Sequence, residues 1–541
     1  MVELLGFDFI NQEQHNYENP YFGNAAGSQG RAYKYSRNTL SSTFNQLLTY
    51  KRTIADKHNL DFLVGHENYQ YKYNYLMGAK SGFPFGGLYE LDAAATVITA
   101  GSYEDNYTIE SFLSRLNYNF DDKYYLSGSY RRDGSSRFYN ENRWGDFWSI
   151  GGNWRISQES FMQSLSWIRN MNIKASFGVQ GNDAVGGYYP YQALYDLGYP
   201  NAGMNGAVVA SIANNDLKWE KNENLNIGFD ARLFDRVSIS AEWYKRVTKD
   251  MLMAYPLAMS TGFLSYQKNI GSMQNTGVEV TVAVDMVTSK DLRWSLTLMG
   301  STVQNKILNL ADKPEITAGN YITKEGEVLN SFYLPKSAGI DPATGYQLYW
   351  VWDTASDGTR SEEYITADRS KAAASRVIAG NRMPDLFGSI SNDFKLFQSI
   401  DFSILTTYSI GGKILDGLYA NLLDPLYQGN SLSAHLSRAW SKPGDITDIP
   451  IAQLGANTTT STRNLINASY FTIKNVTLGY SLPKTWMKKL GIENVRISAI
   501  ADNIAMFTHL KGMNPQFNFS GGTDYVYTPT RSISLGLDIT F

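Results

Sequence analysis

The sequence predicts an all-β fold, a transmembrane, antiparallel, up-and-down β-barrel with about 18 strands. Three observations lead to this prediction. Apolar and polar residues alternate with period two, the alternating segments are about ten residues long, and the connections between them are alternately short and long. The final segment, RSISLGLDITF, shows the pattern clearly. Ile533, Leu535, Leu537, Ile539 and Phe541 fall on one side, and small or polar residues fall on the other.

The same alternation recurs along the chain. It is clear in the segments at residues 225–233, 237–243, 278–286 and 292–298. Strands of a soluble sandwich also alternate, but they are typically about five or six residues long. A strand of about ten residues is long enough to cross a bilayer when it is tilted. Strand length therefore favours the membrane barrel. Further strands are expected to begin near residues 39, 108, 328 and 345.

The connections support the same architecture, because outer-membrane barrels have short periplasmic turns and long extracellular loops. Short turns are expected at Phe120–Lys123, Leu233–Arg236, Thr288–Asp291 and Leu396–Ser399. Long polar loops are expected at Arg132–Gly145, Gly181–Leu217, Thr248–Met273, Gly411–Ser469 and His509–Thr530. Aromatic residues near strand ends suggest interfacial girdles, with core packing as the alternative: Trp144, Trp148, Trp219, Trp243 and Tyr480.

Composition excludes several classes of function. The net charge is −3, so the chain lacks the basic signature of a nucleic-acid binder. The absence of Cys removes disulfides, thiolate metal sites and Cys nucleophiles. The sequence contains no run of 18 or more apolar residues, so no transmembrane helix is predicted. The first residues, MVELLGFDFI, carry acidic residues and no basic region, so they do not form a secretory signal.

No constellation of residues predicts an enzyme or a cofactor. The five His residues are scattered without metal-ligand spacing. The segments RRDGSSR (Arg131–Arg137) and IDPATG (Ile340–Gly345) are interpreted as turns, because Asp-Gly and Asp-Pro pairs favour turns. The carboxylate and carbonyls of GND (Gly181–Asp183) could contribute to a calcium site in a loop, and no other cofactor is expected.

Several long motifs, in order, resemble one family. They are the segments Arg115–Glu159, Asn269–Val280, Ser331–Gly345, Met383–Phe397, Asn467–Lys484 and the SLGLDITF end. The chain resembles the SusC-like branch (SusC/RagA) of TonB-dependent outer-membrane transporters, the nutrient importers of Bacteroides and its relatives. The resemblance covers nearly the whole chain.

The resemblance implies a 22-stranded barrel filled by an N-terminal plug, with a TonB box that couples to the TonB–ExbB–ExbD complex of the inner membrane. It also implies a SusD-like surface lipoprotein as partner and a location in the outer-membrane lipid of a Gram-negative, Bacteroidetes-type cell. The terminal Phe541 resembles the family's barrel-assembly signal. No plug or TonB box is found here, so residues 1–541 are expected to be the barrel, incomplete at the N-terminus.

The expected function is TonB-dependent import of oligosaccharides or peptides, without catalysis. Tyr188, Tyr189, Trp350 and Trp352 are candidate substrate contacts, expected to be exposed, although a girdle or loop-packing role is an alternative. Two other interpretations stay open. One is a passive porin-like channel, and the other is a surface β-rich adhesin or carbohydrate-binding protein.

Overall fold

The computed structural model describes residues 1–422, 437–452, 458–487, 491–509, 514–517 and 529–541. The chain divides into two compact units. Unit 1 is Met1–Trp154, Ala175–Leu225 and Thr248–Ile270, and unit 2 is Arg155–Lys174, Asn226–Val247 and Gly271–Phe541. Three strands contribute residues to both units: β7 (Ile168–Asn182), β10 (Glu220–Leu233) and β11 (Val237–Lys249).

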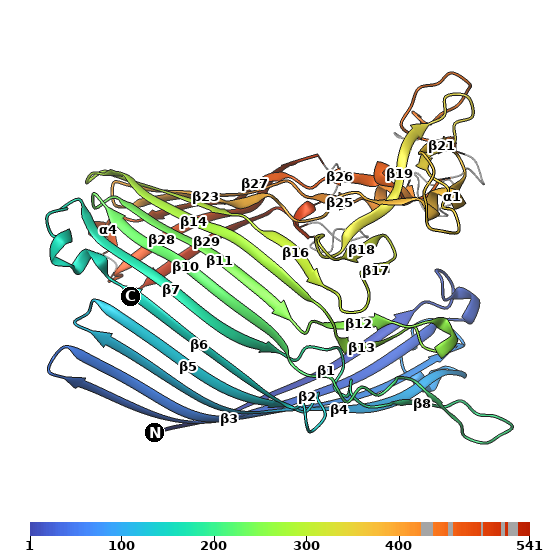
Figure 1. Ribbon diagram of the computed structural model, residues 1–541, viewed down its shortest axis with the longest axis horizontal. Coiled ribbons are helices and arrows are strands. Elements are labelled where there is room, and N and C mark those ends of the chain that lie inside the picture. The colour runs from blue at the N-terminus through green and yellow to red at the C-terminus, as the bar shows by residue number, and fades with distance from the viewer. Residues whose placement is uncertain (423–436, 453–457, 488–490, 510–513, 518–528) are drawn as a thin grey trace. The chain divides into compact units, whose positions relative to one another are not determined.

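Unit 1 is built on six strands that pair antiparallel, each with the next along the chain (Figure 1). They are β1 (Val2–Glu18), β2 (Arg31–Ile54), β3 (His58–Ser81), β4 (Thr96–Phe120), β5 (Tyr124–Ser135) and β6 (Trp144–Trp154). Its loops carry β8 (Tyr195–Leu197), β9 (Ala207–Val209), β12 (Leu252–Pro256) and β13 (Ser265–Asn269).

Tight turns join the strands of unit 1 at one end. Asp121 and Asp122, within the expected turn Phe120–Lys123, both have positive φ, as do Ala55 and Asp56 between β2 and β3. Two consecutive residues with positive φ form the type I′ turn, whose twist matches that of antiparallel strands. The turn expected at Phe120–Lys123 is therefore confirmed.

The strands β2, β3 and β4 are much longer than the sequence suggested, with 24, 24 and 25 residues. The expected beginnings near 39 and 108 were too late, because β2 begins at Arg31 and β4 begins at Thr96. The reason is visible on the face of β3 that carries Leu60, Phe62 and Val64. Beyond Val64 this face becomes polar, and the large side chains change to the opposite face at Tyr69–Tyr75, so the phase of the alternation that the prediction depended on is interrupted within one strand.

Unit 2 contains a second antiparallel run, in which β14 pairs with β15 and then β23, β24, β27, β28 and β29 follow in order. Its strands are β14 (Ser272–Thr288), β15 (Leu292–Ser301), β16 (Gln304–Asn309), β23 (Leu386–Leu396), β24 (Ile400–Ile410), β27 (Tyr470–Ser481), β28 (Asn494–Thr508) and β29 (Ser532–Thr540). The turns expected at Leu233–Arg236, Thr288–Asp291 and Leu396–Ser399 are confirmed.

A separate small sheet occupies residues that the sequence assigned to the barrel. It contains β17 (Glu315–Ala318), β18 (Tyr321–Lys324), β19 (Ser331–Ile340), β20 (Gln347–Val351), β21 (Tyr364–Thr366) and β22 (Arg376–Ile378). The strands expected to begin near 328 and 345 are therefore β19 and β20 of this sheet. In the described residues, 17 strands are hydrogen-bonded into one large sheet, and about 18 barrel strands were expected.

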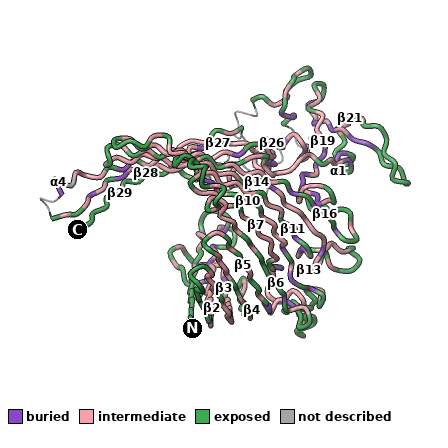
Figure 2. Tube along the Cα trace, turned by 60° about the vertical axis from the view of Figure 1, so that its left-hand side comes forward, coloured by how far each residue is buried: buried purple, intermediate pink, exposed green. Residues whose placement is uncertain are grey.

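In the part of the chain that the structure describes, the α-helices are few and short: α1 (Arg369–Ala374), α2 (Gly417–Leu422) and α4 (Lys484–Met487). None of the helices in the described ranges has the length and apolar character needed to cross a membrane. The two-faced pattern predicted for the end of the chain is present in β29, which is exposed along most of its length (Figure 2). The last pair of the ladder between β28 and β29 is Asn494 with Thr540, and Phe541 lies one residue beyond it.

The aromatic residues expected near the interfaces divide into two groups. Trp144, Trp148, Trp243 and Tyr480 are exposed, as a girdle requires, whereas Trp219 is buried. Trp219 packs in a core with Phe138, Phe147, Val185 and Leu217, and its indole N–H donates to the carbonyl of Arg143 at 2.8 Å. For Trp219, the alternative interpretation as a core residue is therefore confirmed, and the interpretation as a girdle residue is wrong.

Candidate functional site

The four predicted substrate contacts do not form one cluster. Tyr188 and Tyr189 belong to unit 1, while Trp350 and Trp352 belong to unit 2. They were expected to be exposed, and this expectation is wrong. Tyr188, Tyr189 and Trp350 are half-buried, and only 8% of the surface of Trp352 is accessible. Each ring packs against neighbouring loops or strands, contacts that alternation in sequence does not reveal.

Tyr188 joins an aromatic group on the strands of unit 1. Its ring stacks on Tyr71 with centroids 5.7 Å apart, and the guanidinium of Arg137 lies 5.4 Å from its centroid and 4.3 Å from that of Tyr107. Burial, together with the hydrogen bond to Tyr71, raises the pKa of Tyr188 to about 12, so the phenol stays neutral at physiological pH. Tyr189 Oη accepts from the backbone N–H of Asn106 at 2.9 Å.

The segment proposed for calcium holds Asp183 beside a cation. The carboxylate of Asp183 accepts from Tyr107 Oη and Ser135 Oγ, both at 2.7 Å, and lies 3.3 Å from Arg137 Nη1. The described residues contain no group of three or more His, Cys, Asp or Glu side chains that could hold a metal ion. The calcium site at Gly181–Asp183 stays a prediction.

The segment RRDGSSR is not the turn that was expected. Asp133 and Gly134 lie inside β5, opposite Gly145 and Trp144 of β6. Arg131 donates to the carboxylates of Asp133 and Glu67, at 2.6 and 2.7 Å, in a network on one face of the sheet. IDPATG does form a turn, in which Asp341 accepts from Thr344 Oγ1 at 2.6 Å and the pKa of Asp341 is lowered by that bond.

Trp350 lies in β20 of the small sheet and Trp352 directly follows that strand, and the two side chains have different surroundings. The ammonium of Lys336 lies 5.4 Å from the Trp350 ring, and the guanidinium of Arg360 lies 4.5 Å from the Trp352 ring. The backbone of Trp352 exchanges two hydrogen bonds with Ser375 Oγ, at 3.1 and 3.0 Å. Trp352 is therefore part of the packing of this sheet.

Trp352→Ala is expected to destabilise the small sheet by about 3–5 kcal/mol, because it removes a large buried side chain. Trp350→Ala is expected to leave this sheet intact, since its ring is only half-buried. Limited proteolysis of the exposed segment 353–363 measures the difference. Equal cleavage rates for the two variants would contradict this account of their packing.

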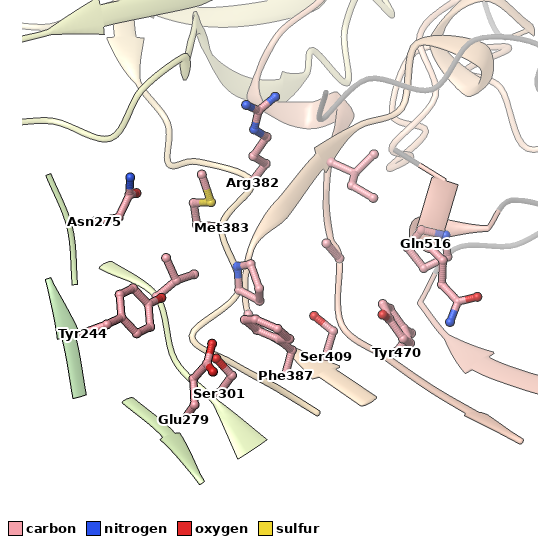
Figure 3. Close-up of a pocket in the computed structure, with 16 residues that line it drawn as sticks. Tyr244, Asn275, Glu279, Ser301, Arg382, Met383, Phe387, Ser409, Tyr470 and Gln516 are labelled. Atoms are coloured by element: carbon pink, nitrogen blue, oxygen red, sulfur yellow. The ribbon is translucent and has the colours of Figure 1, made fainter. Parts of the chain in front are cut away.

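Unit 2 contains a cavity of about 420 Å³ at the strand ends opposite the tight turns (Figure 3). One row of directly paired residues crosses five strands along it: Glu279, Ser301, Phe387, Ser409 and Tyr470. Residues directly opposite each other in antiparallel strands point to the same face. On β23 this is the face of Ser389, Ser391 and Asp393, which is the polar face. The cavity therefore lies on the polar side of the sheet.

Segments distant in sequence complete the cavity. Arg382, Met383 and Pro384 come from the connection between β22 and β23, and Tyr244 and Gln516 come from elsewhere in the chain. Figure 3 shows Arg382 and Met383 beside the strands. Burial lowers the pKa of Arg382. Ser301 Oγ is buried and has no hydrogen-bond partner among the described residues. The cavity thus combines rings, hydroxyls, a carboxylate and a guanidinium, which suits a polar ligand that also offers apolar surface.

Sequence reasoning did not find this cavity. Alternation in sequence does place Glu279 and Ser301 on polar faces. It does not give the register that aligns five strands, nor the connection that brings Arg382 over them.

Comparison with known proteins identifies the family. The family model for the β-barrel of TonB dependent receptor-like proteins matches residues 5–504, and the chain belongs to this family. TonB-dependent receptor P39 of Formosa agariphila is 28% identical over 99% of this chain and 56% of its own length. TonB-dependent receptor SusC of Bacteroides thetaiotaomicron is 25% identical over 99% of this chain and 53% of its own length.

Solved structures agree with the fold class. The structure of the RagAB peptide transporter superposes with a TM-score of 0.89 at 28% identity, over 100% of this chain and 60% of that chain. The predicted resemblance to the SusC/RagA branch and the antiparallel barrel fold are both confirmed. The chain spans about half the length of the curated relatives that it matches.

Proposed function

We propose that the chain is the barrel portion of an outer-membrane transporter of the SusC/RagA type. It would import oligosaccharides or peptides in a TonB-dependent manner, together with a SusD-like lipoprotein, and would catalyse no reaction. The observation that carries the proposal is the superposition on a RagAB peptide transporter over the whole chain. The relative named SusC and the polar face of the barrel strands support it.

In this proposal the barrel supplies the passage and the loops supply the vestibule. The cavity beside Arg382 and Tyr470 lies at the strand ends that carry the long loops, where a solute would enter. Tyr188, Tyr189, Trp350 and Trp352 stay candidate substrate contacts. Coupling to TonB–ExbB–ExbD would require segments of the kind that the longer relatives possess.

Deletion of the gene, followed by growth on a panel of oligosaccharides and peptides, tests the proposal. We expect uptake of one solute class to fall to background and to return when the gene is restored. Unchanged growth and uptake on every member of the panel would contradict the proposal. Solubility of the native protein without detergent would contradict the outer-membrane location and favour the adhesin alternative.

A further inference from the structure

Eight tyrosines lie on one face of the sheet formed by β2, β3 and β4, and we call this surface the tyrosine face. Every second residue from 69 to 75 of β3 is Tyr, in the segment NYQYKYNY. The register places residues of β2 and β4 on the same side. The members are Tyr33 and Tyr35 of β2, Tyr69, Tyr71, Tyr73 and Tyr75 of β3, and Tyr103 and Tyr107 of β4.

The tyrosine face lies on the polar side of the sheet. Leu60, Phe62 and Val64 point to the opposite side, and this apolar band begins next to the tight turn between β2 and β3. About ten residues of a tilted strand are enough to cross the hydrocarbon. Tyr69 lies about that far from the turn, so the tyrosine face belongs to the part of the sheet that extends towards the long loops.

The rings form a continuous surface and do not close into a core. Tyr73 and Tyr75 have centroids 6.5 Å apart with ring planes at 24°, and Tyr75 lies 4.9 Å from Tyr103. Tyr33 and Tyr35 are nearly parallel, at 4°. Tyr103 is 53% exposed, and the other members are half-buried. Ring surface therefore stays accessible along the strands.

Hydrogen-bonding groups lie between the rings. Thr39 and Ser41 of β2 stand opposite Tyr73 and Tyr71, and Asp105 of β4 stands opposite Tyr73. The guanidinium of Arg37 lies 4.9 Å from the Tyr35 centroid and 5.5 Å from that of Tyr75. Aromatic rings beside hydroxyls and fork-shaped donors suit a ligand with alternating C–H and O–H surfaces, as sugar rings present.

Charge on this surface is balanced. Within it Arg37 is accompanied by Asp105, and at its border Arg137 is paired with Asp183. A surface without net charge is complementary to a neutral ligand and gives no advantage to charged peptides. Four tyrosines on alternate positions of β3 extend over about 20 Å, which fits several linked rings better than one.

We infer that the tyrosine face binds neutral oligosaccharides by stacking sugar rings on Tyr71, Tyr73 and Tyr75. The inference rests on the proposed function, because it names a binding surface and substrate class for the same transporter. Tyr188, which stacks on Tyr71, borders this surface and is the one predicted substrate contact that the inference includes.

The test is direct binding, measured apart from transport. The protein is purified from the outer membrane in detergent and titrated calorimetrically with maltohexaose, xylohexaose and mannohexaose, and with hexaalanine as the peptide probe. We expect at least one hexasaccharide to bind and hexaalanine not to bind. Tyr73→Leu should weaken that binding roughly tenfold, since the ring is lost.

Two further variants separate binding from folding. Tyr73→Phe keeps the ring and should retain most of the affinity, and Asn74→Ala alters the neighbouring residue on the opposite face and should change nothing. Failure of every hexasaccharide to bind the wild type, or equal affinity of Tyr73→Leu and wild type, would overturn the inference. Preference for hexaalanine would overturn it as well. If the wild-type protein binds no hexasaccharide but still supports solute uptake, only this inference is contradicted. If it binds a hexasaccharide but supports no uptake, the proposed function is contradicted.

Discussion

Gly388→Ala is expected to abolish most of the folded protein. Gly388 of β23 stands opposite Gly300 of β15 and Tyr408 of β24. A Cβ at Gly388 would overlap the carbonyl oxygen of Met299 and lie 2.8 Å from Tyr408 Oη, which donates to that carbonyl at 2.9 Å. Because backbone has to move, the cost should reach or exceed about 3 kcal/mol. Heat-modifiable migration in gels and urea unfolding measure the effect.

Gly101→Ala is the matched control for this substitution. Gly101 also lies inside a long strand, β4, but no atom lies within 4 Å of the position that its Cβ would take. We expect this variant to accumulate and unfold like the wild type. Equal accumulation and equal urea stability of Gly388→Ala and Gly101→Ala would contradict the close approach of β15, β23 and β24 at Gly388.

Removal of Phe541 is expected to lower the amount of assembled protein several-fold while leaving the stability of the assembled fraction unchanged. Phe541 is 86% exposed and lies beyond the last ladder pair of β29, so its loss removes little packing. A role in assembly, as the family resemblance implies, would then act before the fold is complete. Quantitative immunoblots of outer membranes measure the amount, and urea unfolding measures the stability.

Phe541→Trp keeps an aromatic side chain at the end of the chain and should assemble at nearly the normal level. A fall in urea stability proportional to the fall in amount would show that Phe541 acts through packing, contrary to the prediction. Equal amounts of the Phe541-deleted and wild-type proteins would contradict the assembly role itself.

Much of the fold could be predicted from local patterns. Period-two alternation depends on which residues face lipid, so it located β14, β15 and β29 and the turns between strands. It failed where the large side chains change from one face of a strand to the other, as in β3 beyond Val64, and where short alternating strands pack in a separate sheet, as in β19 and β20. In both places the environment, not the local pattern, determines the structure.

The candidate sites were harder to predict, since they depend on register and on connections distant in sequence. The row from Glu279 to Tyr470 requires the alignment of five strands. The tyrosine face, in contrast, had a visible signal in NYQYKYNY, four rings at alternate positions. That signal indicates a continuous aromatic surface only when β2 and β4 are placed beside β3, because Tyr35 and Tyr103 then lie on the same surface.

The dependence of uptake on energy distinguishes a TonB-dependent transporter from a passive channel. Cells that express the protein from its native locus are given the labelled solute whose uptake the gene deletion abolishes. A protonophore then collapses the gradient across the inner membrane. We expect saturable uptake to stop while surface binding persists. Uptake that continues at an unchanged, non-saturable rate would identify a passive channel and contradict the assignment as a TonB-dependent transporter.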